Sequence, residues 1–409
     1  MRYAHIIVLF SIAILCQTAW SDPCYVTTAA EFQTALNNIA NQTGCDTCGD
    51  SGQNYCPQII VDTGETIVIN SGWLSIGQGH EYLQLTINGT IEWGGGNCDN
   101  CKMLQLSDAT HVTISGTGKF MVPSDIVFPN PDDPLQGVPV AIKIVGDCSD
   151  IEIDGLEFEN VSYMINQENG DSDNLTFTNL TGTKLWEYGI FTSDVDGMTI
   201  DDCHVGVDQG AIGTYRYHGL RLYGDNITVT DCSAYNTGAY GLWRVDGDIA
   251  TIDGFTSNEN IRLGPNHSCV GGAGVDTGQR THRLIAKNIT TTGNVEVQNG
   301  TIGCYLENIT SSQISIGNGN GFNIVPRPVN RVLWKDTSAT PSPAETPGTG
   351  CIGIELGEFT CFGDINSDDQ VNVNDLLAVI NNWGACEAWD EALGGTCEDL
   401  PPCILPCLA

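Results

Sequence analysis

Basic residues are scarce in this chain. Its 409 residues contain 15 Lys and Arg against 50 Asp and Glu, which gives a formal net charge of −35. A surface so evenly negative repels nucleic acid and anionic membranes, so neither is an expected partner. Calcium sites account for only a few of the acids. The excess is typical of an exported protein adapted to salty or calcium-containing water.

Long apolar runs are also scarce. The run Ile6–Leu15 follows Arg2 and precedes the small residues of Ala19-Trp20-Ser21. It is shorter than the roughly 20 apolar residues of a membrane span, and it has the pattern of an export signal. We therefore predict a signal peptide over residues 1–21, a secreted mature protein and no membrane-spanning segment.

Cysteine, in contrast, is abundant. Removing Cys16 with the export signal leaves 17 of the 18 cysteines. In an exported protein these should mostly form disulfides, and the odd number leaves at least one unpaired. The pairs Cys45-x-x-Cys48 and Cys98-x-x-Cys101 also have the spacing of zinc ligands. Their position near other cysteines favours disulfides that hold an N-terminal cap.

The chain lacks the sustained 3.6-residue periodicity of a helical repeat, and a shorter alternation takes its place. An apolar, polar, apolar, polar, turn-forming pattern recurs along the chain, and the copies that start between residues 151 and 250 lie 23 to 29 residues apart. Its copies start at Leu85, Val112, Ile151, Leu175, Met198, Ile227, Ala250, Leu284, Leu306 and Val332.

That interval is the length of one coil of a β-solenoid. The alternation sends every second side chain inward, and Asn, Asp or Gly makes the turn to the next strand. No coil can bury its apolar face alone, so coils stack and equivalent residues form ladders. We predict an all-β, right-handed parallel β-helix over residues 83–336. The ladder after the turn should consist of Leu156, Leu180, Cys203, Cys232, Phe255 and Ile289.

The two cysteines of this ladder, Cys203 and Cys232, have two interpretations. They are either buried ladder members or the two halves of a disulfide between neighbouring coils, and the repeat favours the first.

The segments on either side of the β-helix differ from it in composition. Residues 22–82 fit a disulfide-stapled cap, in which Ala29–Ala40 has a helical pattern. Such a cap covers the open end of a solenoid, where unpaired strand edges would otherwise aggregate. Residues 337–360 form a Pro/Thr/Ser-rich linker with a strand, and residues 361–409 form a small α-helical module with a Cys-rich tail.

The final module contains a sharply defined calcium motif. Side-chain oxygens recur at loop positions 1, 3, 5, 9 and 12, and position 7 offers a backbone carbonyl, as Ca²⁺ requires. An apolar-faced helical pattern follows at once. The predicted calcium ligands are Asp364, Asn366, Asp368, Gln370, Asn372 and Asp375.

This segment of about 22 residues resembles the repeat of type I dockerins. The resemblance implies Ca²⁺ as the cofactor and a cohesin-like or cell-surface partner. Two features depart from the family: Asp369 stands where Gly is usual, and residues 385–409 show no second repeat. A lone calcium-bound module that anchors or spaces the protein is therefore an equal alternative.

The repeat over about 250 residues resembles the pectin-lyase-like class of right-handed β-helices. That resemblance implies a monomer that acts on a polysaccharide, as a lyase or a glycoside hydrolase, or a non-catalytic glycan-binding protein. The fold pattern alone does not choose between them.

The scarce cations gather in one stretch of the repeat. Seven of them lie within 72 residues, with Tyr, Trp and His among them. On so acidic a chain, such a cluster indicates a pocket for an anionic group; the alternative is that the cations merely neutralise neighbouring acids. The seven are Arg216, Arg221, Arg244, Arg262, Arg280, Arg283 and Lys287.

Alignment of the coils predicts one outer face. The strands Gly189-Ile190-Phe191, Gly219-Leu220-Arg221, Gly241-Leu242-Trp243 and Gly274-Val275-Asp276 should each turn their third residue outward. Aromatic rings there can stack on sugars, and arginine can bind a carboxylate or sulfate. The predicted substrate-binding residues are Phe191, Trp243, Arg244, Tyr223, Arg262 and Arg280.

Two reactions fit this face, and we favour the lyase slightly. In β-elimination, arginine neutralises a uronate carboxylate, His218 or Tyr217 removes a proton, and Tyr217 or Tyr223 protonates the leaving oxygen. The predicted catalytic residues are His218, Tyr217, Arg221, Arg216 and Asp276. In hydrolysis, two carboxylates flank the bond. The candidates for that pair are Asp194, Asp208, Asp246 and Asp276.

Overall fold

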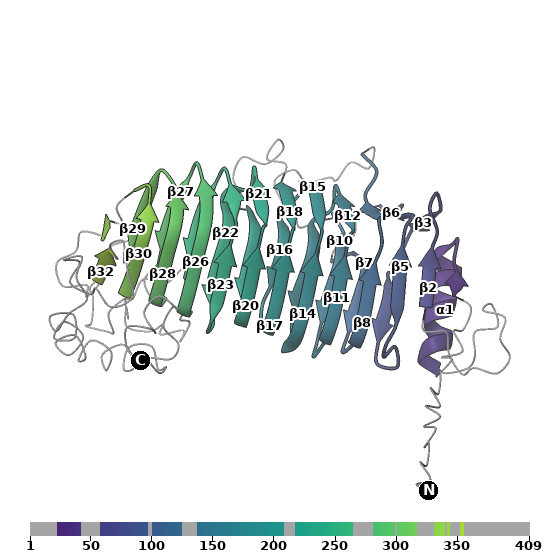
Figure 1. Cartoon of the computed structure of the whole chain (residues 1–409). Coiled ribbons are helices and arrows are strands. Elements are labelled where there is room, and N and C mark those ends of the chain that lie inside the picture. Colours follow the sequence, from purple (N-terminus) through teal and green to yellow (C-terminus); the bar gives the residue numbers. More distant parts are fainter. Residues whose placement is uncertain are drawn as a thin grey trace, which may run out of the picture.

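The described part of the protein is a stack of parallel strand coils along one axis (Figure 1). This computed structural model describes residues 23–41, 58–96, 100–124, 137–207, 217–264, 281–298, 301–316, 331–339, 342–343 and 352–355. No helix among these residues is long and apolar enough to cross a membrane.

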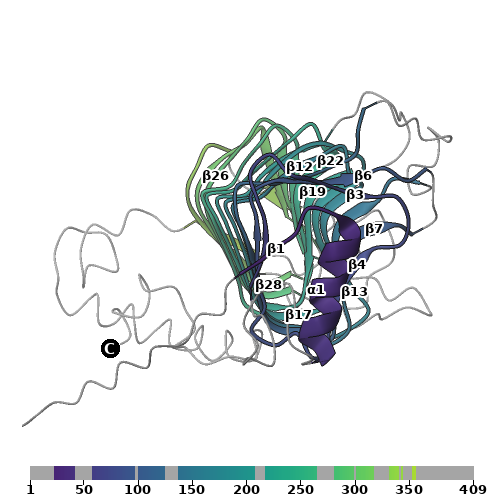
Figure 2. The ribbon, with the colours of Figure 1, turned by 90° about the vertical axis from the view of Figure 1, so that its right-hand side faces the viewer.

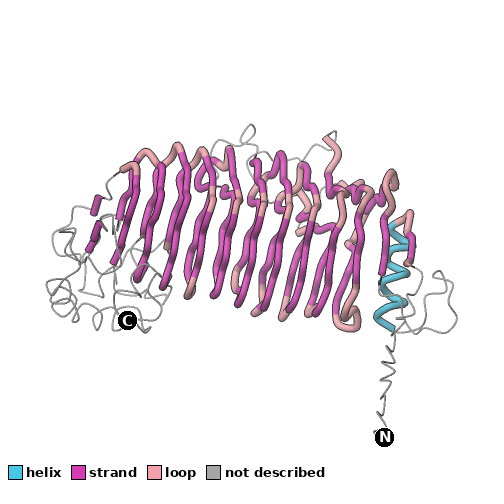
Figure 3. The backbone as a smooth tube through the Cα atoms, in the orientation of Figure 1, coloured by secondary structure: helices cyan, strands magenta, loops and turns pink. Residues whose placement is uncertain are grey.

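Within these ranges the strands form two sheets, here called sheet A and sheet B, and they run across the long axis (Figure 3). Sheet A contains β1 (Cys24–Tyr25), β2 (Gln58–Val61), β3 (Thr66–Ile69), β5 (Gln84–Ile87), β6 (Thr90–Trp93), β8 (Thr110–Ser115), β9 (Lys119–Met121), β11 (Ser149–Asp154), β12 (Glu157–Glu159), β14 (Ser172–Thr178), β15 (Thr181–Leu185), β17 (Val195–Asp201), β18 (His204–Val207), β20 (Asp225–Thr230), β21 (Ser233–Tyr235), β23 (Ala250–Asp253), β24 (Thr256–Ser257), β26 (Thr281–Thr291), β28 (Thr301–Thr310), β30 (Arg331–Thr337) and β32 (Ile352–Glu355).

Sheet B takes one strand from each coil. It contains β4 (Leu74–Gly77), β7 (Lys102–Ser107), β10 (Val140–Val145), β13 (Tyr163–Glu168), β16 (Tyr188–Thr192), β19 (Tyr217–Tyr223), β22 (Gly238–Asp246), β25 (Asn260–Leu263), β27 (Asn294–Val297), β29 (Gln313–Ile316) and β31 (Ser342–Pro343).

The strand register confirms the predicted repeat. Equivalent apolar residues pair in parallel from coil to coil, beginning with Ile151 and Leu175. The same row continues through Met198, Ile227, Ala250 and Leu284. The described part is thus an all-β parallel β-helix with one short helix, and it fits the predicted right-handed β-helix.

The ladder after the turn is also confirmed. All six predicted residues are buried at 2% exposure or less. Cys203 and Cys232 carry free thiols, as do Cys148 and Cys304, so the two ladder cysteines are packing residues and not a disulfide. The hydrogen bond with Cys232 and burial together raise the pKa of the Cys203 thiol, which keeps it protonated.

Helix α1 (Ala29–Asn41) confirms the helical segment of the cap and lies across one end of the coil stack (Figure 2). Its N-terminus has a capping box, because Thr28 Oγ1 accepts from the Glu31 N–H and Glu31 accepts from the Thr28 N–H. Its apolar face buries Phe32, Ala35, Leu36 and Ile39. The helix therefore covers the end of the first coils.

The β-helix extends beyond the predicted limits of 83 and 336. At its start β2 pairs in parallel with β5, and at its end β32 pairs with β30. The calcium motif and the rest of residues 361–409 lie outside the described residues.

Each sheet B strand near the centre departs from simple alternation. In β19, Gly219 and Leu220 both lie in the interior, while His218 and Arg221 lie on either side of them along the outer face. Glycine is required at the first interior position because sheet A approaches closely there. A Cβ on Gly219 would overlap the Ala234 side chain and the Gly241 carbonyl oxygen.

We therefore predict that Gly219→Ala lowers the free energy of unfolding by about 1–3 kcal/mol through overpacking. Gly96→Ala is the matched control, because a Cβ at Gly96 would meet nothing within 4 Å. Denaturant titration of both variants measures the difference. Equal stability of the two variants would contradict the close approach of the sheets.

Candidate functional site on the outer face of sheet B

The parallel register arranges the outer residues of sheet B in two rows. The first, called the aromatic ladder, consists of Tyr163, Tyr188, His218 and Tyr240. The second, called the mixed ladder, consists of Gln105, Lys143, Asn166, Phe191, Arg221, Trp243, Arg262 and Glu296. Neighbouring rungs lie about 4.8 Å apart.

The aromatic ladder is a continuous stack of rings. Ring centroids lie 5.2 Å apart between Tyr163 and Tyr188, and 5.3 Å apart at the next two steps, through His218 to Tyr240. Trp243 adds an edge contact with His218 at 5.1 Å. His218 is only 3% exposed, so the imidazole is held by ring contacts on several sides. Its role as a base stays a prediction.

Arg221 occupies an aromatic box where the two ladders meet. Its guanidinium carbon lies 4.6 Å from the Trp243 ring centroid and 5.5 Å from that of Phe191. It donates to the hydroxyl oxygens of Tyr188 at 3.2 Å and Tyr223 at 2.5 Å. Its Nε–H is buried without a hydrogen-bond partner. Among the described residues, the box thus holds a charged group with neutral and π partners only.

Three other outward cations among the described residues have carboxylate partners. Arg262 pairs with Glu296 at 3.0 Å, Lys143 with Glu168 at 2.9 Å, and Arg283 with Asp248 at 2.6 Å. No carboxylate in the described ranges lies within ion-pair distance of Arg221. Neutralisation of nearby acids therefore explains the paired cations, but not Arg221.

Arg244 was predicted to bind substrate, and that prediction is wrong. Arg244 is fully buried and aligns with the interior residues Leu222 and Leu263. It donates to the carbonyls of Leu222, Gly224 and Asp246. The cause is alternation, because Trp243 points outward and its successor must point inward. Burial lowers the pKa of Arg244 to about 10, which still leaves it charged at neutral pH.

Asp276 was predicted to line the same outer face as Trp243, and that stays a prediction, but the rungs after Trp243 on the mixed ladder are other residues. Arg262 pairs with Trp243, and Glu296 follows Arg262. The strand β25 lacks the Gly-apolar start of its neighbours, so the sequence pattern passed over it. Asp276 itself lies outside the described residues, together with Arg216, Arg280 and Asp208, while Tyr217 begins β19 without a described side chain.

Trp243 is enclosed more fully than a sugar-stacking residue would be. It is 6% exposed, and its indole N–H donates to the Gly264 carbonyl at 3.0 Å. Arg221 and Arg262 lie over its ring at 4.6 and 5.3 Å. Its observed contacts are therefore with the two arginines, and its stacking on sugar stays a prediction.

Several residues of this face were not predicted. Tyr163 and Tyr188 lie before the paired interior residues, where simple alternation places them inward. Glu187, only 4% exposed, lies beside them. Burial, then the neighbouring Glu187 carboxylate, raises the pKa of Tyr163. No sequence signal marks Glu187, because it precedes its strand in a loop.

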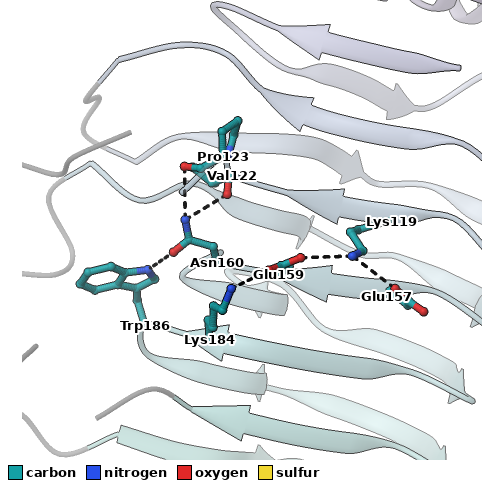
Figure 4. A network of polar contacts seen from close by, with 8 residues as sticks. All are labelled: Lys119, Val122, Pro123, Glu157, Glu159, Asn160, Lys184 and Trp186. Carbon is teal, nitrogen blue, oxygen red and sulfur yellow. Dashed lines mark hydrogen bonds and ion pairs between the residues drawn. The ribbon is translucent and has the colours of Figure 1, made fainter. Parts of the chain in front are cut away.

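The loop that carries Glu187 is fixed by a polar network (Figure 4). The Trp186 indole N–H donates to Asn160 Oδ1 at 2.8 Å, and the Asn160 amide donates to the Val122 carbonyl at 3.0 Å. Next to it, Glu159 accepts from Lys119 at 3.1 Å and from Lys184 at 2.8 Å. These hydrogen bonds and ion pairs connect three successive coils at the point where the chain enters β16.

Carboxylates gather at the turn from sheet B to sheet A. Burial raises the pKa of Asp194, and its neighbour Asp171 raises it further. Burial also raises the pKa of Asp246, with Asp194 and Asp225 adding to the effect against the nearby Arg244. Two of the predicted hydrolase candidates thus lie close enough to interact. The described residues contain no group of His, Cys, Asp or Glu arranged to hold a metal ion.

Comparisons with known proteins found no matching family model and no matching curated protein. Among solved structures, endo-xylogalacturonan hydrolase from Aspergillus tubingensis is 14% identical with a TM-score of 0.48; the match covers 81% of this chain and 92% of that one. A tailspike protein mutant of E. coli bacteriophage HK620, in complex with a pentasaccharide, is 10% identical with a TM-score of 0.49. That match covers 80% of this chain and 60% of the tailspike. The fold assignment rests on the strand register described above.

The contrast between the two arginines gives a testable prediction. Arg244→Met leaves three buried carbonyls without their donor and should lower the free energy of unfolding by about 3 kcal/mol or more. Arg221→Met should change the free energy of unfolding far less, because burying a guanidinium that has no carboxylate partner contributes little to stability. Thermal unfolding midpoints measure both variants. Equal destabilisation would show that Arg221 is also structural.

Proposed function

We propose that the outer face of sheet B binds an acidic polysaccharide and that the protein cleaves it, by β-elimination in preference to hydrolysis. The observation that carries this proposal is Arg221, a guanidinium in an aromatic box with no carboxylate partner among the described residues. On a chain with a net charge of −35, such a group is a specific receptor for an anion.

The ligand is a polymer because the site is a row. The mixed ladder runs along the coil axis, and its rungs lie about 4.8 Å apart, close to the length of one sugar unit in an extended chain. The rings of Phe191 and Tyr223, which are only partly buried beside Arg221, offer faces on which a sugar can stack. Phe191, Tyr223 and Arg262 are half-buried beside it, as neighbours of a bound chain would be.

The tyrosines around Arg221 favour elimination. Arg221 would bind the uronate carboxylate and stabilise the negative charge that develops when a base removes the C5 proton. The electrons form the C4–C5 double bond, the C4–O bond breaks, and an acid protonates the leaving oxygen. Burial raises the pKa of Tyr188, so its hydroxyl stays protonated and can donate a hydrogen bond to the leaving oxygen. His218 and Tyr217 are the candidate bases, and Tyr217 and Tyr223 are the other candidate proton donors.

Arg221→Lys keeps the charge but loses the planar fork, and Arg221→Ala loses both. We expect both variants to lower kcat/KM on a uronate polymer, the alanine variant by about 100-fold, as loss of about 3 kcal/mol of charge-assisted binding implies. The assay follows the ultraviolet absorbance of the unsaturated uronate product together with new reducing ends.

Lys287→Gln is the matched control, since this cation of the same stretch is paired with Glu307 on sheet A. It should leave activity unchanged. Reducing ends without the absorbance would indicate hydrolysis, and binding without either product would indicate a non-catalytic glycan-binding protein. Full activity of Arg221→Ala on every acidic glycan would remove the proposed site.

Hydrolysis is the second candidate function, and one observation favours it. The raised pKa values of Asp194 and Asp246 suit a general acid beside a second carboxylate. Both side chains lie at the turn that follows the mixed ladder. The product assay above separates this reaction from elimination.

We further propose, from sequence alone, that the protein is secreted and that residues 364–375 bind calcium. Full-length protein should bind one Ca²⁺ in this segment in calorimetric titration, and Asp364→Ala with Asp368→Ala should abolish that site. Asp173→Ala, which removes an exposed carboxylate from β14, is the control and should leave binding unchanged. Calcium binding that survives the double substitution would contradict the motif.

A further inference from the structure

A second group of cations lies on the same outer face, four coils before Arg221. Lys102 Nζ lies 3.9 Å from the ring centroid of Trp73, whose side chain is 46% exposed. Lys143, on the next coil, pairs with Glu168 at 2.9 Å and donates to Asn100 Oδ1 at 3.3 Å. Cations thus recur along the sheet at both ends of the aromatic ladder.

This group has a surplus of positive charge. Burial lowers the pKa of Lys102, and the nearby Lys143 lowers it further. Glu168 is the one carboxylate among the described residues that pairs with either lysine. Among the described residues, two ammonium groups therefore share one carboxylate, which is a local excess of positive charge in a strongly acidic protein.

Two neighbouring amide oxygens are also without partners. Gln105 Oε1 and Asn166 Oδ1 are buried and accept no hydrogen bond. Both belong to the mixed ladder, on the rungs on either side of Lys143. An unpaired buried acceptor costs free energy, and rotation of these two amides toward the outer face would let them accept from hydroxyl donors of a bound sugar, which would remove that cost.

We propose that Lys102, Lys143, Gln105 and Asn166, with Trp73 at the edge, form a second subsite for an anionic sugar of the same chain that Arg221 binds. This inference rests on the proposed function and deepens it. Lys143 lies three rungs from Arg221, about 14 Å along the ladder, so one extended chain must carry its anionic groups repeatedly to reach both. The substrate is therefore a polyanion and not a neutral glycan with an isolated charge.

The test measures how binding depends on ligand length. We would titrate galacturonate and mannuronate oligomers, each as disaccharide and octasaccharide, into full-length wild type and into the double variant Lys102→Gln with Trp73→Ala. The double variant should bind the octasaccharide about tenfold more weakly, as loss of one charge-assisted contact implies, and the disaccharide as wild type does. The salt dependence of octasaccharide binding should also become less steep.

Controls separate folding from binding. Lys184→Ala removes an exposed lysine from β15, which belongs to sheet A, and should leave every affinity unchanged. Lys102→Arg alone should retain most of the octasaccharide affinity, and unfolding midpoints should match wild type. Equal octasaccharide affinity of wild type and the double variant would overturn the second subsite alone. Failure of wild type to bind any oligomer would overturn the proposed function with it.

Discussion

Parallel register from coil to coil is the constraint on which the rest of the structure depends. Because each residue lies above its equivalent in the preceding coil, side chains of one kind become rows, in the interior as on the outer face. In the interior this produces the buried ladder that includes Cys203 and Cys232. On the outer face it places the rings of Tyr163, Tyr188 and His218 at the rung spacing. A row of functional groups follows from a repeated fold, without any loop to position it.

The electrostatics of the outer face depend on which side chains occupy the mixed ladder. A guanidinium removed from water loses hydration, and a carboxylate partner normally compensates, as Glu296 does for Arg262. Around Arg221 the compensation comes from tyrosine hydroxyls and ring faces, which are weaker partners than an anion. A carboxylate or sulfate that enters the box would therefore bind with a more favourable free energy than the same group would at an exposed lysine. The low exposure of Trp243 and His218 strengthens this effect, because it lowers the local polarity.

The sequence predicts the coils well, since alternation and turn residues are local signals. It also places Phe191, Arg221 and Trp243 on one row, because the Gly-apolar-x pattern recurs in their strands. It fails where geometry departs from that pattern. The pair of consecutive interior residues moves Tyr188 and His218 outward, and no local signal reveals it. Arg244 was predicted on the outer face because its charge was given more weight than its position in the alternation, which points inward. Arg262 was predicted as a substrate-binding cation, but its place as the rung after Trp243 was not. Glu187 depends on a loop fixed by contacts between three coils.

The same glycines connect the fold to the site. At the first interior position, β7, β10 and β13 carry Met103, Ala141 and Met164, whereas β16, β19 and β22 carry Gly189, Gly219 and Gly241. Those three strands are the ones that supply the box around Arg221. Without a side chain there, sheet A packs directly against sheet B, through Val205, Ala234 and Ser257. The backbone on both sides of the glycine is then fixed by packing, which sets the outward residues of each strand. A larger residue would push the strand outward and separate Tyr188 from Arg221 before it unfolded the coil. The glycine pattern that first identified these strands is therefore part of what holds the guanidinium between its rings.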